Sequence, residues 1–209
     1  MEINNLQVSI DKEIAFQLIG CKKDNPLYEE MENLYEELDD VFKNLIEPKM
    51  ILGFSSAEDI FGVGNVWPGE EFAVVLCTLG DKISQYIEDL FEACEYLKGT
   101  LADAMADSCL FSVEKEWKEI LRGECSVRKR GIAKRMEAPE DFPTEYHKKL
   151  WHFLKGERLG VTLTSGYMFD PVKTCCYLFR LSKDCSNQNV DHDCSRCGNK
   201  DCVLRRYEQ

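Results

Sequence analysis

The stretch FAVVLCTLGDKISQYIEDLF (Phe72–Phe91) indicates how this chain folds. Its first eight residues form a nearly continuous apolar run that includes β-branched side chains, as in a strand that is buried on both faces. Gly80 and Asp81 then turn the chain and cap a helix. Apolar side chains recur on one side of that helix (Ile83, Ile87, Leu90, Cys94 and Leu97). We therefore expect a buried strand that leads directly into a core-facing helix.

Apolar residues at helical spacing predict further helices. One is expected over Leu27–Leu45, with acidic residues on its other faces. We expect Gly99 to end the helix described above, and another helix to run over residues 100–122. Thr144–Leu154 is the last expected helix. Stripes of this kind usually face a core and do not by themselves indicate a cofactor.

Short extended segments predict the remaining strands. Apolar and polar residues alternate in Leu6–Ile10, which predicts a first strand. Later strands are expected over Gly131–Glu137, Val161–Thr164, Tyr167–Phe169 and Cys175–Leu181. The basic run Arg128–Arg130 precedes them, and three adjacent charges usually form a solvated edge. The chain contains no internal repeat and no low-complexity tract.

Length and composition are those of a folded globular protein. The 209 residues suffice for a real core, and 44% of them are hydrophobic. The net charge of −12 argues against nucleic acid or an anionic membrane as the partner. No apolar run approaches the roughly 18 residues that a transmembrane helix needs, and Met1–Asn5 does not resemble a signal peptide. We expect a cytoplasmic protein, and its eleven cysteines suit a redox or anaerobic setting.

Four cysteines near the end of the chain have the spacing of metal ligands. Cys185, Cys194, Cys197 and Cys202 are separated by eight, two and four residues. They lie in a polar tail that cannot bury enough apolar surface to order itself, so a bound metal is the expected organiser. His192 could substitute for one of the four thiolates.

Two explanations other than metal binding could account for this spacing, and two kinds of metal centre fit it. A disulfide pair is disfavoured because thiols in the cytosol usually stay reduced, and a chance cluster of four is improbable. Both zinc and an iron–sulfur cluster accept four thiolates, and C-x2-C runs serve both. A thioredoxin-type redox pair is disfavoured because Cys194 neither follows a strand nor opens a helix.

Motifs of self-contained catalysis are missing from the sequence. There is no phosphate-binding loop with a lysine, and Gly62–Gly69 is expected to form a glycine-rich turn. There is no G-x-S-x-G elbow, and His147 and His152 do not share a helical face. The D-x-H-x-x-G signature of a corrinoid-carrying domain is also absent. We therefore look for a function that depends on another protein.

Several segments in order carry a resemblance to one family. Thr78–Phe91, Leu101–Trp117, Pro139–Leu154 and Leu159–Thr174 resemble the activation domain of cobalamin-dependent methionine synthase, particularly its small stand-alone bacterial relatives. The C-terminal C-x2-C-x4-C-x2-R element of those relatives is matched by Cys194, Cys197, Cys202 and Arg205. The resemblance covers most of the chain after about residue 70.

The resemblance implies both a fold and a role. The fold is a C-shaped α+β domain, with a twisted antiparallel sheet and flanking helices, over residues 1–182, followed by a Cys-rich metal-binding tail over residues 183–209. In the synthase, this domain binds S-adenosylmethionine and docks on the corrinoid domain. There, inactive cob(II)alamin is reduced and methylated with electrons from a separate donor.

This chain departs from the family at the nucleotide-binding motif, R-x-x-P-G-Y-G. Arg135 is one residue too far from Pro139, and Glu140 and Asp141 stand where the motif has flexible, uncharged residues. Carboxylates there would repel the carboxylate of the ligand, and non-glycine residues adopt positive φ only at a cost. We therefore expect S-adenosylmethionine to bind far more weakly than it binds to the intact motif.

The resemblance also implies a docking surface. Cys175 and Cys176 stand where the family's strand approaches the corrinoid, and Tyr167 is also expected to contribute to cofactor binding. Adjacent strand residues face opposite ways, so at most one of the two cysteines can point into a cleft. The expected surface is the segment Tyr167–Cys176 together with the loop Ala138–Pro143, and not the acidic helix Leu27–Leu45.

Two hypotheses of different classes follow. The first is an accessory protein that docks on a corrinoid protein or a cobalamin-dependent methyltransferase and assists its reductive reactivation. In that role an iron–sulfur cluster on the tail cysteines would pass an electron. The alternative is a non-catalytic interaction module with a structural zinc site in the tail. A true S-adenosylmethionine-dependent activator is weakened by the missing glycines.

Overall fold

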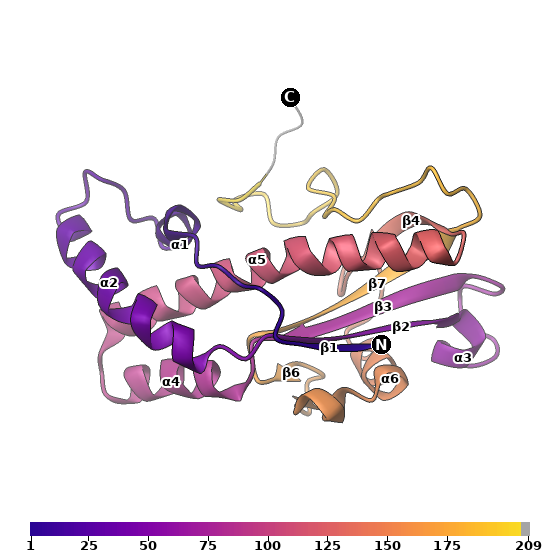
Figure 1. Ribbon diagram of the computed structural model, residues 1–209, viewed down its shortest axis with the longest axis horizontal. Helices are drawn as coiled ribbons and strands as arrows, with labels where there is room; N and C mark the ends of the chain where they lie inside the picture. Colours follow the sequence, from indigo (N-terminus) through magenta and orange to yellow (C-terminus); the bar gives the residue numbers. More distant parts are fainter. Residues whose placement is uncertain (206–209) are drawn as a thin grey trace.

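The structure is a computed structural model that describes residues 1–205. Its centre is an antiparallel sheet of five strands in the order β1-β2-β3-β7-β4 (Figure 1). The strands are β1 (Glu2–Asn4), β2 (Lys49–Ser56), β3 (Glu71–Thr78), β4 (Gly131–Met136) and β7 (Thr174–Ser182). Because β7 pairs with β3 on one side and β4 on the other, this late segment of the chain is an interior strand of the sheet.

Strand β3 is the middle of the sheet and is buried on both faces. Ala73 and Val75 belong to the hydrophobic core on one face, and Val74 and Leu76 belong to the core on the other. A strand covered on both sides needs apolar residues at every position, which explains the unbroken apolar run. The prediction of a buried strand that leads into a helix is confirmed.

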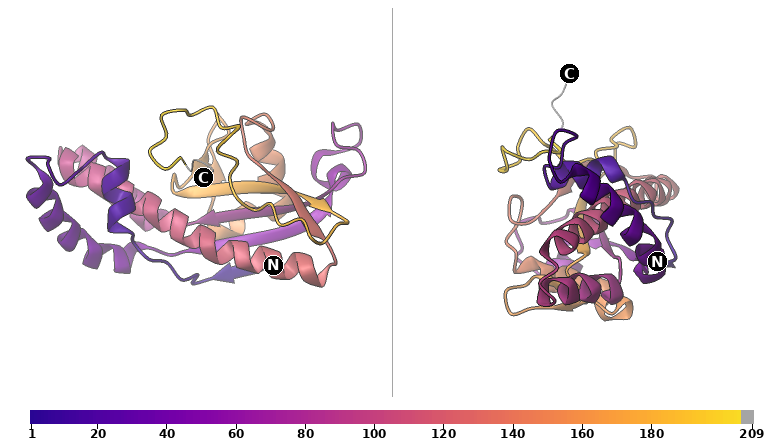
Figure 2. Two further views of the ribbon diagram at one scale, coloured as in Figure 1. Left: turned by 90° about the horizontal axis from the view of Figure 1, so that it is seen from above. Right: turned by 90° about the vertical axis from the view of Figure 1, so that its left-hand side faces the viewer.

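Helices cover one face of the sheet. The long helix α5 (Tyr96–Val127) runs along it, and Trp117 is fully buried there against Tyr177, with 5.1 Å between the ring centroids. Three more helices pack around the N-terminal part of α5, beyond the end of the sheet (Figures 1 and 2). They are α1 (Lys12–Leu18), α2 (Tyr28–Leu45) and α4 (Asp81–Glu92).

Shorter elements cover the other face. They are α3 (Ala57–Phe61), α6 (Tyr146–Leu154), a 3-10 turn (Gly156–Leu159), and the two-stranded sheet of β5 (Thr162–Leu163) and β6 (Phe169–Asp170). Gly53 of β2 allows α6 to approach, because a Cβ atom there would lie 2.7 Å from Leu154 Cδ2. The second core lies between these elements and the sheet.

The predicted strand at Leu6–Ile10 is wrong. The first strand is β1, and residues 6–10 form no strand. Side chains of α5 take the place of a neighbouring strand: the Gln7 amide donates to Glu116 Oε2 at 2.5 Å, and the Ser9 amide donates to Ser112 Oγ at 3.0 Å. The alternating pattern arises because the segment lies along a helix with one side buried.

The predicted helix break at Gly99 is also wrong. Helix α4 ends at Glu92, and Cys94, with φ of 62°, makes the turn into α5. Gly99 lies inside α5, where a Cβ atom would sit 3.2 Å from the ring of Phe91. Its role is to let α4 and α5 pack closely.

The other predicted elements are found. Helices α2 and α6 and strands β4 and β7 lie where they were expected, and β5 is shorter than expected. The strand predicted over Tyr167–Phe169 is wrong for Tyr167 and Met168, because β6 begins at Phe169. Gly62–Gly69 is a turn region, and Arg128–Arg130 forms the exposed connection from α5 to β4. Within residues 1–205, no helix has the length and apolar character that crossing a membrane requires.

Candidate functional site

A cavity of about 470 Å³ lies on the α5 side of the sheet. Its walls are α5, the strands β4 and β7, and the C-terminal segment of residues 183–205, which we call the tail. The tail runs beside α5 and across β4 and β7 (Figure 2). The cavity falls in the size range of small-molecule and cofactor sites.

The tail is held against the edge of β4. Gln188 forms a parallel bridge with Ile132, and the Asn189 side chain donates to the Ala133 carbonyl at 2.9 Å. Val190 is fully buried in the main core. One residue further, Asp191 Oδ1 lies 2.7 Å from Lys118 Nζ of α5. The tail, which forms one wall of the cavity, is therefore anchored to β4 and to α5.

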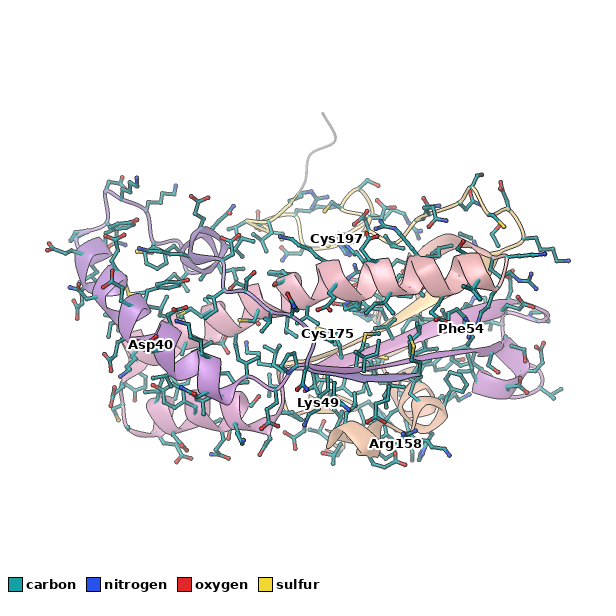
Figure 3. All side chains as sticks on the ribbon, in the orientation of Figure 1. Asp40, Lys49, Phe54, Arg158, Cys175 and Cys197 are labelled. Atoms are coloured by element: carbon teal, nitrogen blue, oxygen red, sulfur yellow. The ribbon has the colours of Figure 1, made fainter. Side chains whose placement is uncertain are left out.

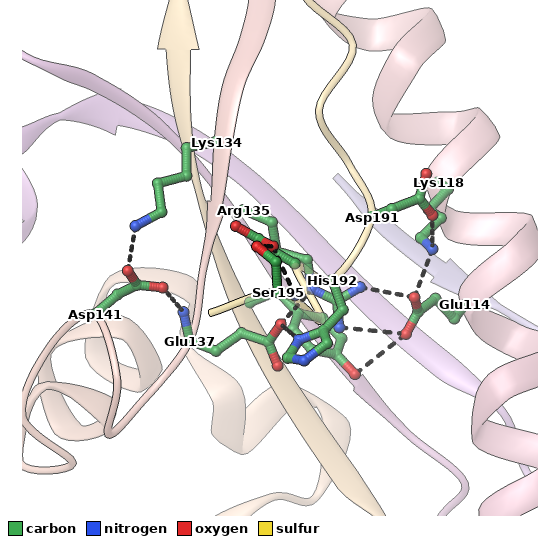
Figure 4. A network of polar contacts seen from close by, with 11 residues as sticks. Glu114, Lys118, Lys134, Arg135, Glu137, Asp141, Asp191, His192 and Ser195 are labelled. Atoms are coloured by element: carbon green, nitrogen blue, oxygen red, sulfur yellow. Dashed lines mark hydrogen bonds and ion pairs between the residues drawn. The ribbon is translucent and has the colours of Figure 1, made fainter. Parts of the chain in front are cut away.

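Arg135 of β4 is the buried charge of this site. Its side chain is 5% exposed, and its guanidinium lies 4.1 Å from the ring centroid of Tyr177. Its Nη1 donates to Glu114 Oε1 at 2.7 Å, and its Nε lies 2.8 Å from Glu137 Oε1 (Figure 4). Two carboxylates thus neutralise one guanidinium.

Glu114 joins Arg135 to a second cation. Lys118 Nζ lies 2.6 Å from Glu114 Oε1, and the Tyr177 hydroxyl lies 3.5 Å from Oε2. Burial alone would raise the pKa of the Glu114 carboxyl, but Arg135 and Lys118 outweigh it and hold the pKa below its usual value. Burial also raises the pKa of Tyr177 well above its ordinary range. Glu114 is therefore ionised and Tyr177 is neutral at neutral pH.

The tail contributes a second polar cluster to the cavity. His192 Nδ1 lies 2.8 Å from Glu137 Oε1 (Figure 4). Burial lowers the pKa of His192, but hydrogen bonds to Glu137 and Cys197 raise it further than burial lowers it. The pKa of Cys197 is lowered, first by its hydrogen bond with His192 and then by the Asn199 amide. Cys197 is therefore a thiol in a setting that favours its thiolate.

Comparisons with known proteins identify the fold. No protein-family model matches the chain, and no curated protein matches it. Among solved structures, it is similar to the MetH reactivation domain bound to AdoHcy, with a TM-score of 0.61 and 12% sequence identity over 88% of this chain and 78% of that chain. The chain has the reactivation-domain fold. The fold predicted from the sequence, α+β with an antiparallel sheet and flanking helices, is confirmed.

The tail cysteines occupy two places on the reactivation-domain fold. Cys194, Cys197 and Cys202 line the cavity, and Figure 3 shows Cys197 on the tail above α5. Cys185 is exposed and does not line the cavity. Within residues 1–205, no group of three or more His, Cys, Asp or Glu side chains is placed to hold a metal ion. A metal on the four predicted ligands stays a prediction.

Only one of the predicted cofactor-binding residues lines this cavity. Arg135 lines the cavity, but Pro139, Tyr167, Cys175 and Cys176 do not. Cys175 packs against the α5-side core, and Cys176 belongs to the opposite core. The Tyr167 carbonyl lies 3.0 Å from His147 Nδ1, on the α6 side of the sheet. The structure therefore does not bring Tyr167 and Cys176 to the cavity that holds Arg135.

Several residues of the cavity were not expected from the sequence, and three of them form the polar network around Arg135 and His192. Glu114, Glu137 and Tyr177 come from α5, from the residue after β4 and from β7. A signal for Glu114 was present, since it follows the core position Val113 and stands four residues before Lys118. Nothing local marks Glu137 or Tyr177, because their proximity depends on the pairing of β4 with β7.

Proposed function

We propose that this chain docks on a corrinoid protein or a cobalamin-dependent methyltransferase and assists its reductive reactivation. The observation that carries the proposal is the reactivation-domain fold over 88% of the chain. In reactivation, one electron converts cob(II)alamin on the partner to cob(I)alamin. The cobalt of cob(I)alamin then attacks the methyl group of a separate methyl donor, and the demethylated donor leaves with the electron pair of the broken bond. A separate one-electron donor supplies the electron, and an iron–sulfur centre on the tail cysteines would pass it on. We place this role in the cytoplasm.

The docking surface we propose is the one expected from the sequence, Tyr167–Cys176 with Ala138–Pro143. A chain of ring contacts supports treating the two segments as one surface. The ring centroid of Phe142 lies 6.2 Å from that of His147, which lies 4.8 Å from that of Phe169. Two large apolar side chains of this surface, Met168 and Val172, are 59% and 66% exposed.

Exposed apolar side chains rimmed by polar ones are typical of a surface that a partner covers. The acidic helix α2 lies beyond the end of the sheet, away from β6 and α6 (Figure 1). It therefore supplies a control surface for the docking experiment.

The residues present fit S-adenosylmethionine poorly. Arg135 is already bound by Glu114 and Glu137, so its charge is not free for a ligand carboxylate. In the loop after β4, Asp141 pairs with Lys134 and accepts the Glu137 amide at 3.2 Å. An amide that could bind a ligand is thus occupied by the chain itself. We propose that S-adenosylmethionine binds weakly and that the methyl donor is not held at this loop.

Capture from native cell extract tests the docking proposal. Immobilised chain should recover a corrinoid protein or its methyltransferase, identified by mass spectrometry and by its corrinoid spectrum. Met168→Arg should abolish recovery, because it places a charge on the apolar surface, whereas Glu36→Arg on α2 should not. Recovery of only unrelated proteins, or loss with Glu36→Arg alone, contradicts the proposal. The interaction module with a structural zinc would then be the better description.

Calorimetric titration tests the proposal on the nucleotide. S-adenosylmethionine should give little heat at concentrations that saturate a protein with the intact motif. Tight binding with one ligand per chain would contradict our reasoning and restore an S-adenosylmethionine-dependent activator as the function.

A further inference from the structure

The cavity between the tail and α5 stays open although apolar side chains form part of its wall. Ile14 of α1, Phe111 of α5 and Leu204 of the tail line it, and Phe111 is 37% exposed. Apolar walls inside proteins normally close on each other and leave few voids larger than a water molecule. An open space of about 470 Å³ beside such walls is therefore suited to an apolar group from outside the chain.

One face of α5 supplies both an apolar and a charged part of the wall. Phe111, Glu114, Lys115 and Lys118 are spaced by three, one and three residues, so they lie on the same side of the helix. All four line the cavity. Because Phe111 and Lys115 are neighbours on this face, a ligand that packs on the ring can also reach the lysine.

The three carboxylates that line the cavity are already paired with cations of the chain. Glu114 lies 2.7 Å from Arg135 and 2.6 Å from Lys118. Glu137 lies 2.8 Å from Arg135, and Asp191 lies 2.7 Å from Lys118. These contacts join the three acidic side chains into one network with two of the four basic side chains of the wall, which leaves no isolated carboxylate for a cationic ligand.

The other two basic side chains of the wall, Lys115 and Arg205, have no carboxylate partner among residues 1–205. Arg205 is nevertheless held in place, because its Nη2 donates to the Cys194 carbonyl at 2.5 Å and its Nη1 donates to the Asn199 carbonyl at 2.8 Å. Carbonyl oxygens orient a guanidinium but do not cancel its charge. Two uncompensated cations therefore meet at one cavity of a protein whose net charge is −12.

These contacts determine which charge a ligand should carry. A cationic group in the cavity would lie near Lys115 and Arg205 and would gain no free carboxylate. An anionic group would accept charge-assisted hydrogen bonds from these two side chains, and such bonds are about twice as strong as bonds between neutral groups. The apolar part of the wall favours a ligand whose remaining atoms are apolar.

We propose that the cavity binds a small amphiphilic organic anion. Lys115 and Arg205 bind its acidic group, and its apolar or aromatic body packs on Ile14, Phe111 and Leu204. A carboxylate, a sulfonate and an organic phosphate share the chemistry that these cations recognise. The docking surface proposed above lies around β6 and α6, on the other side of the sheet, so this site can be tested without a corrinoid partner.

Fluorescence titration of the full chain with anilinonaphthalene sulfonate tests the charge of the ligand. The probe should bind saturably, with one molecule per chain, and the uncharged phenylnaphthylamine should bind at least about tenfold more weakly, as expected for the loss of one charge-assisted contact. Lys115→Gln should weaken binding of the sulfonate by a similar factor and leave binding of the uncharged analogue unchanged. The control Lys148→Gln makes the same change of charge on the exposed side of α6 and should affect neither.

Alkylation of the cysteines tests where the probe binds. Cys194, Cys197 and Cys202 line the cavity, whereas Cys185 is exposed and lies outside it. Saturating probe should slow alkylation of the three cavity cysteines, followed over time by mass spectrometry, and leave the rate at Cys185 unchanged. Far-ultraviolet circular dichroism of each variant shows that a change in binding does not come from unfolding.

Equal affinity for the charged and uncharged probes, or unchanged binding of the sulfonate to Lys115→Gln, would overturn the assignment of an anion. Protection of all four cysteines, or of none, would overturn the assigned place. Competition tests the two parts of the ligand: naphthoate and naphthyl phosphate should displace the probe, whereas inorganic phosphate should not. Displacement by inorganic phosphate at the same concentrations would overturn the role of the apolar wall. Failure of capture together with normal binding of the probe would count against the proposed function alone.

Discussion

Replacing Glu114 by glutamine should destabilise the protein, because it removes a buried carboxylate that pairs with Arg135 and Lys118. The side chain of Glu114 is 15% exposed and that of Arg135 is 5% exposed, so solvent screens their interaction little. Breaking a buried ion pair by removing one partner costs about 3–5 kcal/mol. Arg135 keeps Glu137 and Lys118 keeps Asp191, so we expect about 3 kcal/mol, the low end of that range. For a chain of this size, that lowers Tm by about 6–12 °C.

The effect should depend on pH in a definite direction. The pKa of Glu114 is held below its usual value in the folded protein, so its stabilisation is present above the unfolded-state pKa of about 4.3 and is lost as pH falls through the folded value. Glutamine does not titrate. The difference in unfolding free energy between native chain and Glu114→Gln should therefore be largest near neutral pH and should narrow in acid.

Urea unfolding followed by circular dichroism at several pH values measures this difference. The matched control is Glu124→Gln, on the same helix, which removes an exposed pair with Arg128 and should cost at most about 1 kcal/mol. A loss for Glu114→Gln no larger than for the control would refute the buried network. If the difference in unfolding free energy grows as pH falls, the assigned direction of the pKa shift of Glu114 is refuted.

Two further predictions concern packing and the buried thiols. Gly99→Val should lower the unfolding free energy by about 1–3 kcal/mol, since the added atoms meet the ring of Phe91. The control Gly123→Val, where a Cβ atom meets nothing within 4 Å, should change the unfolding free energy by less than about 0.5 kcal/mol. Equal effects of the two variants in denaturant titrations would contradict the close packing of α4 on α5. Burial raises the pKa of Cys109 to about 12, so an alkylating reagent at mildly alkaline pH should label the exposed Cys185 of the native protein and leave Cys109 unmodified. Mass spectrometry should find both cysteines labelled after denaturation. Labelling of Cys109 in the native protein would show that this core is open to the reagent.

The parts of the fold that could be predicted have strong local patterns. Strand β3 has an unbroken apolar run, and α2 has a long amphipathic stripe, so both were located from the sequence. Helix α1 has only seven residues, too few for a period to be recognised, and its stability comes from packing on α5. Gly99 was misread because a glycine that allows close helix packing and a glycine that ends a helix look the same in sequence.

The candidate site was predictable only where its residues lie close together in the chain. The spacing of Cys194, Cys197 and Cys202 marked the tail. The partners of the tail could not be found in this way, because Glu114 and Tyr177 are 63 positions apart and meet only through the place of β7 in the sheet. The position of Cys185 outside the cavity likewise depends on the path of the tail along the edge of β4.

Reductive reactivation is the central claim, and the visible spectrum of the captured corrinoid protein tests it most directly. The partner is prepared with its corrinoid as cob(II)alamin, and a one-electron donor and a methyl donor are added with and without this chain. We predict that the chain speeds the loss of the cob(II)alamin absorption and the appearance of methylcob(III)alamin, and that Met168→Arg removes the effect. An unchanged rate in the presence of a saturating amount of correctly folded chain would contradict the account.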